Sequence, residues 1–551
     1  MTSLRAARPR VLLTVLAAGT LLLASACDDG ATSGQDRAAG TTSPAPAAPA
    51  APTATPTPAP RPTGADDPAL KPFYGQQITW AACPADPKAA EAKIDISGMQ
   101  CGRLHVPLDY ADPATDALDL ALIKLPAARP DQRIGSLMVN PGGPGASGVE
   151  MVKYGAERFD GTLHKRFDVI GFDPRGTGDS SPVVCLDDKQ HDALGEQDDL
   201  PDPQARKARH QQRNAEFAAA CQAGSGRLLP FIGTRNTARD LDVLRAAVGD
   251  QKLNYLGVSY GTYLGSLYAE EFPKNTGRLI LDGAVDPTQE RLDSSIKQQI
   301  GFEKSFERFA ADCVENHADE CSLGKDPARA AEKAADFLDG LRDHPLTVNG
   351  RRVGSGQGWT GTMSLLYGDE KTTWKYLRLS LNLAMLHGKG DGLLAFADEY
   401  NGRDEKGHYD PSQDALRAIR CADVAAPAPS PERAQAAVKQ LQEQAPLLTK
   451  GTTADDLSEP QCANWPFETP EKPHTVRAEG SAPILVVGTT GDPATPYAAA
   501  EALAKGFANA TLLTLTGEGH GAFGKGNVCV DRAMEAYLTE GTLPAAGTRC
   551  S

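Results

Sequence analysis

The chain has 551 residues, with 56 basic and 71 acidic side chains and a formal net charge of −15. This length excludes a mini-protein held together by disulfides alone, and 40% hydrophobic with 23% charged residues is the composition of a soluble globular protein. The acidic balance argues against a nucleic-acid partner, because phosphate binding relies on clustered Lys and Arg. The 11 cysteines, an odd number, need an explanation.

The first 26 residues are typical of an export signal. Three arginines precede an uncharged stretch over 11–26, which is shorter than the roughly 20 residues of a membrane-spanning helix. The small residues before Cys27 resemble the lipobox of bacterial lipoproteins, in which the cysteine becomes the acylated N-terminus, although Ala24 stands where Leu is more usual. We therefore expect a lipoprotein on the extracytoplasmic face of the cell membrane, and secretion after ordinary cleavage is the alternative.

Residues 27–72 are predicted to be a disordered tether. Positions 41–60 contain only Thr, Ser, Pro and Ala, a composition that cannot form a core and favours an extended chain. The folded part is expected to begin near Phe73.

If Cys27 carries lipid, ten cysteines remain, and an even number in an exported chain indicates up to five disulfides. Connectivity does not follow from sequence, and pairing between neighbours is the simplest scheme. No metal site is expected, because there is no CxxC and no His at zinc-ligand spacing. The neighbouring pairs are Cys83 with Cys101, Cys185 with Cys221, Cys313 with Cys321, Cys421 with Cys462, and Cys529 with Cys550.

From about residue 100, short apolar runs alternate with helical stretches, as in a mostly parallel sheet covered by helices. Between 286 and 483 the chain is mostly helical and charged, without strong strand signals, which predicts a lid, with a separate domain as the alternative. We expect a core of 73–290 and 481–551, interrupted by a helical lid and a cysteine-bearing segment at 291–480. The expected strands are 136–140, 167–172, 253–258, 278–281, 484–487 and 512–515, and the expected helices include 237–248 and 262–272.

Residues 257–261 form the only GxSxG pattern in the chain, after a predicted strand and before a predicted helix. In such an elbow the serine occupies a strained turn, and small residues on either side let strand and helix pass closely. The N-terminus of the following helix stabilises developing negative charge. This context predicts Ser259 as a nucleophile.

A serine nucleophile needs a base. In α/β-hydrolases this base is a histidine oriented by an acid, and the acid and then the histidine follow the serine in chain order. His520 follows a predicted strand in a glycine-rich loop, at the carboxyl end of the expected sheet. Asp492 follows the preceding strand and is expected to orient the ring, with Asp282 and Asp286 as rival acids.

Two backbone donors are needed for the oxyanion of a tetrahedral intermediate. One is expected from Tyr260, directly after the nucleophile. The other is expected from Gly143, in the glycine-rich segment 140–145, where the backbone can approach a substrate.

The sequence resembles the α/β-hydrolase family of prolyl and tripeptidyl aminopeptidases, serine peptidases of which actinobacteria export several. The resemblance extends over about 75–551. Asn140-Pro141 stands where the prolyl enzymes usually have a His, which favours the tripeptidyl branch. The cysteine-bearing segments at 421–423 and 462–466 also resemble the family. The other matching stretches are NPGGPG at 140–145, FDPRGTGDS at 172–180, GVSYGTYLG at 257–265, GDPATP at 491–496 and GEGH at 517–520.

The resemblance implies an α/β-hydrolase fold, with the lid inserted before the last strands. It also implies hydrolysis of peptides from a free amino end through an acyl-enzyme on Ser259, with His520 as the base for deacylation and no cofactor. Recognition of the ammonium group would need carboxylates, and Glu270 and Glu271 are equally compatible with exposed helix positions. A monomer is expected, with a peptide substrate, no nucleic-acid partner, and membrane contact only through the N-terminal lipid.

Two alternatives remain open. The same triad attacks esters, so the first is a carboxylesterase or lipid-active hydrolase. The second is a substrate-binding lipoprotein on a hydrolase scaffold, although binding alone does not call for Ser259, Asp492 and His520 in that order.

Overall fold

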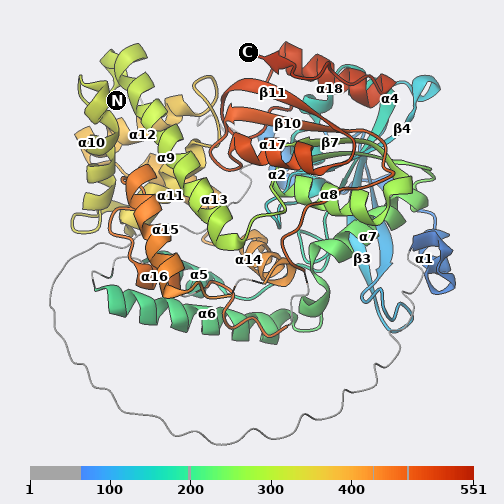
Figure 1. Ribbon diagram of the computed structural model, residues 1–551, viewed down its shortest axis with the longest axis horizontal. Coiled ribbons are helices and arrows are strands. Elements are labelled where there is room, and N and C mark those ends of the chain that lie inside the picture. The colour runs from blue at the N-terminus through green and yellow to red at the C-terminus, as the bar shows by residue number, and fades with distance from the viewer. Residues whose placement is uncertain (1–63, 197–199, 201, 426, 459, 468–470) are drawn as a thin grey trace, which may run out of the picture.

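Figure 1 shows the computed structural model of the protein, which describes residues 64–551 except 197–199, 201, 426, 459 and 468–470. The predicted export signal, Cys27 and the tether as far as residue 63 lie outside the described residues.

Ten strands form one twisted sheet in the order β1-β2-β3-β5-β4-β6-β7-β10-β11-β12. The run from β5 to β12 is parallel, and β1, β2 and β3 pair antiparallel at one side. The predicted mostly parallel sheet is therefore confirmed. The strands are β1 (Ala81–Ala82), β2 (Gln100–Pro107), β3 (Ala117–Leu125), β4 (Gly135–Asn140), β5 (Phe167–Phe172), β6 (Leu253–Val258), β7 (Thr276–Asp282), β10 (Ile484–Gly491), β11 (Ala510–Glu518) and β12 (Arg549–Cys550).

Helices cover both faces of the sheet, so the central strands are buried on two sides and consist of continuous apolar runs. Successive side chains point to opposite faces: Met138 of β4 joins one hydrophobic cluster, and its neighbours Leu137 and Val139 join the other. The first face packs against α1 (Lys71–Tyr74), α7 (Thr234–Ala247), α8 (Tyr260–Glu271) and α17 (Tyr497–Gly506). The second packs against α3 (Gly148–Tyr154), α4 (Thr162–Arg166) and α18 (Val528–Glu540). The short α2 (Pro87–Ala92) precedes β2.

The segment between β7 and β10 is largely helical and has a hydrophobic core of its own, separate from those of the sheet (Figure 1). Aromatic contacts hold this core, including Phe306 against Trp359 and Phe309 against Trp374. We call this segment the lid. Its helices are α9 (Arg291–Asn316), α10 (Pro327–Gly340), α11 (Ser355–Leu365), α12 (Trp374–His387), α13 (Asp391–Tyr400), α14 (Ser412–Asp423), α15 (Pro431–Gln444) and α16 (Ala454–Ser458).

The lid, which the sequence predicted to be mostly helical and without strong strand signals, also contains two short strands. A two-stranded hairpin joins β8 (Leu346–Val348) to β9 (Arg351–Val353). Its turn is Asn349-Gly350, and both residues have positive φ angles, 51° and 83°, as tight hairpin turns require. The Asn-Gly pair was the sequence signal for this hairpin.

The lid also packs against helices that lie earlier in the chain. α5 (Asp188–Glu196) and α6 (Pro203–Ser225) follow β5, and Figure 1 places α6 beside α16. The buried Arg206 of α6 forms an ion pair with Asp456 of α16 at 3.3 Å. Part of the segment predicted as core, 73–290, thus supports the lid.

The folded body begins before Phe73, which corrects the predicted end of the tether. Residues 64–66 and 68–70 form 3₁₀ turns. Leu70 is buried against the first face of the sheet, and Gly64 packs close to Phe272. The apolar Leu70 and the Asp67 cap of the second turn were the signals that the low-complexity composition ends earlier.

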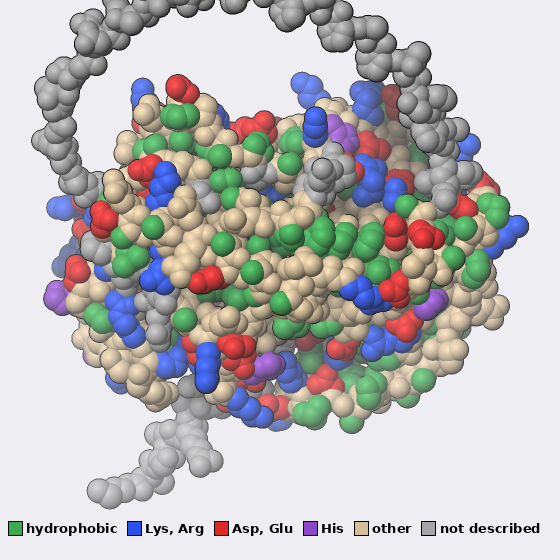
Figure 2. Space-filling model, turned by 90° about the horizontal axis from the view of Figure 1, so that it is seen from below, with side chains coloured by type: hydrophobic (Ala, Val, Ile, Leu, Met, Phe, Trp, Pro, Cys, Tyr) green, Lys and Arg blue, Asp and Glu red, His purple; other side chains and the backbone are tan. Residues whose placement is uncertain are grey.

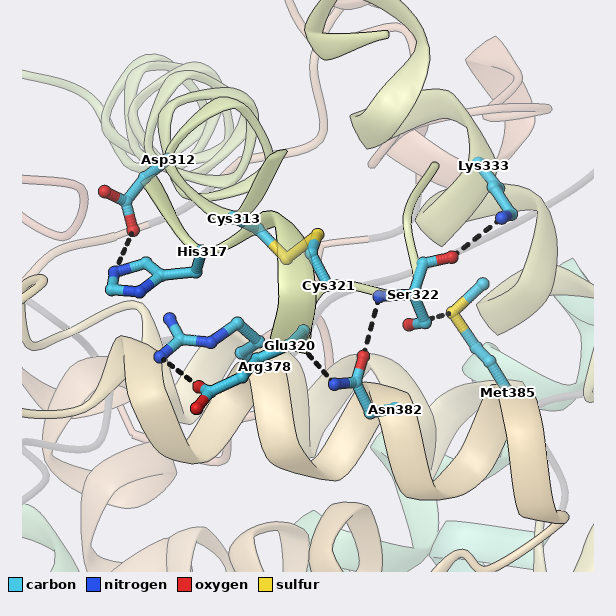
Figure 3. The surroundings of a disulfide bond; sticks show 10 residues. All are labelled: Asp312, Cys313, His317, Glu320, Cys321, Ser322, Lys333, Arg378, Asn382 and Met385. Carbon is cyan, nitrogen blue, oxygen red and sulfur yellow. Dashed lines mark hydrogen bonds and ion pairs between the residues drawn. A yellow bond between two sulfur atoms is a disulfide. The ribbon is translucent and has the colours of Figure 1, made fainter. Parts of the chain in front are cut away.

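Five disulfides join the same neighbouring pairs that the sequence suggested. Figure 3 shows the pair Cys313–Cys321, which ties the end of α9 to the segment before α10. The neighbouring Ser322 and Glu320 then bind Asn382 and Arg378 of α12 (Figure 3). The bridge therefore fixes the position at which three lid helices meet. Five disulfides indicate an extracytoplasmic protein, because thiols in the cytosol are kept reduced.

Figure 2 shows one face of the molecule, on which Lys and Arg side chains are interspersed with Asp and Glu. A mixed surface of this kind is the usual solvated exterior of a globular protein. Within the part of the chain that the structure describes, no helix has the length and apolar character needed to cross a bilayer.

Glu303 of α9 is a buried carboxylate inside the lid. Its carboxylate is buried and accepts the backbone N–H groups of Leu447 and Leu448 at 3.0 and 2.9 Å. Burial raises the pKa of Glu303 from 4.5 to about 7, although these two hydrogen bonds act in the opposite direction.

Glu303→Gln is therefore expected to flatten the pH dependence of stability. Because the folded state holds this proton more tightly, wild-type stability falls as pH rises from about 4.5 to about 7, by about 3 kcal/mol for this group. Urea unfolding at pH 5 and pH 8, with disulfides intact, measures this difference in both proteins. An unchanged pH slope in the variant would contradict the assignment.

Candidate active site

Ser259 lies in the turn between β6 and α8, in a strained backbone conformation with φ 58° and ψ −125°. A non-glycine residue is held there only because its surroundings enforce it. Glycines on both sides allow the turn: a Cβ at Gly257 would lie 2.3 Å from the carbonyl oxygen of Gly261. The turn therefore has the geometry of a nucleophile elbow at the carboxyl end of a central strand.

Asp492 and His520 lie at the same edge of the sheet, after β10 and β11. The Nδ1 atom of His520 lies 2.9 Å from both carboxylate oxygens of Asp492, and both side chains are buried. Burial would raise the pKa of Asp492, but the charge and hydrogen bond of His520, with the N–H groups of Thr495 and Gly521, lower it below its ordinary value. Asp492 is therefore an ionised carboxylate that is hydrogen-bonded to the imidazole of His520.

The rival acids do not contact the ring. Asp282 accepts the backbone N–H groups of Ala522 and Phe523, just after His520, at 2.8 to 3.0 Å. It therefore anchors the histidine loop. Asp286 binds its own neighbours, Thr288 and Gln289.

The far nitrogen of His520 is free to act. Among the described residues, its buried Nε2 has no hydrogen-bond partner. The ring also lies beside the elbow: the Ser259 N–H donates to the Asp282 carbonyl at 2.9 Å, and a Cβ on the next residue, Gly283, would lie 3.2 Å from the ring. The structure thus brings Ser259, His520 and Asp492 to one place.

Thr495 also takes part in this contact, and its place in GDPATP was the one sequence feature that could have pointed to it. Its hydroxyl donates to Asp492 at 3.0 Å and lies 3.2 Å from Nδ1 of His520. Thr495 therefore helps to hold the carboxylate against the ring.

Thr495→Val is expected to lower kcat about 10-fold, because one hydrogen bond to a charged group is lost. Thr495→Ser keeps the hydroxyl and should keep most of the activity. Steady-state kinetics over a pH range measure both variants. Equal loss in the two would contradict a role for the hydroxyl.

The predicted oxyanion loop lies directly against the elbow. Asn140 pairs with Gly257 across β4 and β6, and its side chain accepts the Gly142 N–H at 3.0 Å. Gly142, Gly143 and Gly145 have φ angles of 96°, 102° and 93°, which other residues rarely adopt. The glycines thus allow a backbone conformation that side chains would strain, in a loop that lies beside Tyr260, the other expected donor.

Tyr260 connects the elbow to the lid, a role that the sequence did not indicate. Its hydroxyl contacts Thr234 of α7 and lies 3.5 Å from Asp423 of α14. Asp423 in turn accepts the N–H and hydroxyl of Thr234 at 2.6 and 2.7 Å. Burial raises the pKa of Asp423 to about 6, against the hydrogen bonds of Thr234 and the charge of Arg291. Cys421-Ala422-Asp423, part of the family resemblance, was the available signal.

Glu270 and Glu271 are bound in ion pairs. Glu270 contacts His474 at 3.0 Å, and both acids contact Arg235 at 3.4 Å. Glu271 also binds Arg239 at 2.5 Å. These contacts hold the segment before β10 against α7 and α8 and engage both acids in ion pairs.

This sheet, with a serine elbow after β6 and an acid and a histidine after β10 and β11, defines an α/β-hydrolase, as the sequence predicted. Comparison with known proteins then identifies the family of α/β-hydrolases that the chain resembles. A protein-family model described as TAP-like protein matches residues 451–550. The chain is 38% identical over 491 residues to the serine protease Hip1 of Mycobacterium tuberculosis, covering 87% of this chain and 92% of that protein.

Two further relatives span most of the chain. Carboxylesterase B of Mycobacterium tuberculosis is 38% identical over 494 residues, covering 89% of this chain and 92% of the relative. A tripeptidyl aminopeptidase of Streptomyces lividans is 30% identical over 481 residues, covering 86% of each. The protein belongs to this TAP-like family of α/β-hydrolases and is a serine hydrolase, and both peptidases and esterases are represented among its relatives.

Proposed function

We propose that the protein is an exported serine aminopeptidase of the tripeptidyl type, which releases short peptides from free N-termini. The observation that carries this is the buried Asp492–His520 pair, with an unpartnered Nε2 beside the strained Ser259. The likeness to the tripeptidyl aminopeptidase supports the choice of substrate.

In this mechanism the Ser259 hydroxyl gives its proton to Nε2 of His520 as it attacks the scissile carbonyl. Asp492 stays ionised and stabilises the imidazolium, and its low pKa favours that state. The amides of Tyr260 and Gly143 hold the oxyanion. His520 then protonates the leaving amine and later activates the water that releases the peptide from Ser259.

We propose that the lid decides which substrates reach Ser259, because α14 contacts both the oxyanion loop and α7. We also propose that the mature chain is anchored through acylated Cys27, with the residues after it as a tether. Mass analysis of the protein from membranes tests the anchor, and an unmodified Cys27 in the mature chain would refute it.

A carboxylesterase is the second candidate, and it is favoured by the similarity to carboxylesterase B over nearly the whole chain. A tripeptide anilide, its N-acylated form, and short and long acyl esters separate the two functions. We expect turnover of the free tripeptide anilide and loss of turnover when its amino end is blocked. Turnover of the esters alone would reject the peptidase.

A further inference from the structure

Within the lid, helix α14 lies between the other lid helices and the residues of the candidate active site. Gly145 of the oxyanion loop approaches it so closely that a Cβ there would lie 2.8 Å from the carbonyl oxygen of Ser412. At its other end, Asp423 binds Thr234. Gln413 donates to the carbonyl of Tyr400 in α13 at 2.8 Å. One side of α14 thus faces the catalytic loops, and another faces the lid helix α13.

Arg420 lies two turns after Gln413, on the side of α14 that faces the lid helix α13. The side chains with which it interacts electrostatically are Tyr400 and Tyr367. The Tyr367 ring packs edge-on against the His520 ring, with ring centres 5.5 Å apart. The backbone N–H of His520 also donates to the backbone carbonyl of Tyr367 at 2.8 Å. Arg420 therefore interacts electrostatically with a tyrosine that packs directly on the candidate base.

The guanidinium of Arg420 has no hydrogen bond or ion pair with any residue that the structure describes. Only its backbone is used, as an acceptor for Arg291. The side chain is not sealed off, since the residue keeps intermediate exposure. Arg417, one turn earlier, differs: it donates to Asn214 at 2.6 Å and lies 4.0 Å from the centre of the Phe217 ring.

The charges around Arg420 do not balance. Arg291 lies close enough for the two guanidinium groups to repel each other, and Asp423, the carboxylate that attracts Arg291, already binds Thr234. Burial lowers the pKa of Arg420 and raises the pKa of Tyr367, so the Tyr367 phenol is neutral and supplies no counter-charge. A partly buried cation without a counter-ion is unfavourable, and a bound anion would stabilise it.

We propose that Arg420 is a substrate-binding residue that takes a carboxylate of the substrate, in the form of an acidic side chain close to the scissile bond. A guanidinium can bind a carboxylate through two parallel hydrogen bonds, which gives position as well as affinity. The peptide nature of the substrate rests on the proposed function; the carboxylate preference rests on Arg420.

Pairs of tripeptide anilides that differ by Glu against Gln at one of the three positions test this, because the two side chains have nearly the same shape. Wild-type protein is expected to prefer Glu at one position by about 10- to 100-fold in kcat/KM, the effect of a charge-assisted hydrogen bond. Arg420→Gln should bring that ratio close to 1, and Arg420→Lys should keep part of it. Active protein is counted by fluorophosphonate labelling, so misfolded material does not affect the ratio.

Arg417→Gln is the matched control, since it removes the same charge from the same helix, and the Arg417 side chain contacts Asn214 and Phe217 of α6. It should keep the wild-type Glu/Gln ratio. No preference for Glu in wild-type protein, or an unchanged preference in Arg420→Gln, would overturn the proposal.

The test also separates this proposal from the proposed function. If wild-type protein cleaves no peptide, the aminopeptidase assignment fails, and two aryl esters replace the anilides: the p-nitrophenyl monoester of glutaric acid and p-nitrophenyl valerate. A preference for the carboxylate-bearing ester that disappears in Arg420→Gln supports the role of Arg420. Equal turnover of the two esters by wild-type protein overturns it.

Discussion

Ser259→Ala is expected to reduce kcat about a million-fold on any substrate that the wild-type protein hydrolyses. The alanine cannot form an acyl-enzyme, and the free Nε2 of His520 then has no hydroxyl to deprotonate. Burst kinetics and fluorophosphonate labelling measure the loss directly. Activity within 100-fold of wild type would remove Ser259 from the mechanism.

A second substitution at the same position separates catalysis from folding. Ser259 has a φ angle of 58°, which costs a residue with a Cβ about 1 to 3 kcal/mol. Ser259→Gly should therefore be as inactive as Ser259→Ala but more stable than Ser259→Ala in urea unfolding. Equal stability of the two variants would mean that the strain in the elbow is small.

Most of the sheet could be predicted from sequence because its central strands are buried on both faces. They read as short apolar runs between turn residues, so β5 and β6 were predicted with the bounds that the structure has. The Ser259 elbow and the His520 loop follow from their place after such strands. The central strands, the elbow and the histidine loop could therefore be predicted from local sequence pattern and from position in the sheet.

The remaining features depend on contacts between distant residues, which no local pattern contains. Thr234 and Asp423 are 189 positions apart, and Arg206 meets Asp456 across 250. Both pairs join the lid region to earlier helices. The acid was also ambiguous from sequence, since Asp282 and Asp492 both end neighbouring strands and are both buried. Only the contacts with the ring separate them.

Asp492→Asn is therefore expected to reduce kcat about 10,000-fold. An asparagine keeps the shape of the side chain but cannot stabilise the imidazolium, and it favours the tautomer that leaves Nε2 protonated. The variant should still react slowly with fluorophosphonate and unfold cooperatively. Steady-state kinetics on the best wild-type substrate measure the loss.

Substitutions of the two rival acids, Asp286 and Asp282, are the controls for Asp492→Asn. Asp286→Asn should stay within about two-fold of wild type, because Asp286 binds only Thr288 and Gln289 and surface changes are usually small. Asp282→Asn should weaken the histidine loop, through the N–H groups of Ala522 and Phe523, and so lower stability as well as kcat. If Asp282→Asn lost as much kcat as Asp492→Asn without losing stability, the acid of the triad would be Asp282, and the 2.9 Å contact between Asp492 and His520 would not be catalytic.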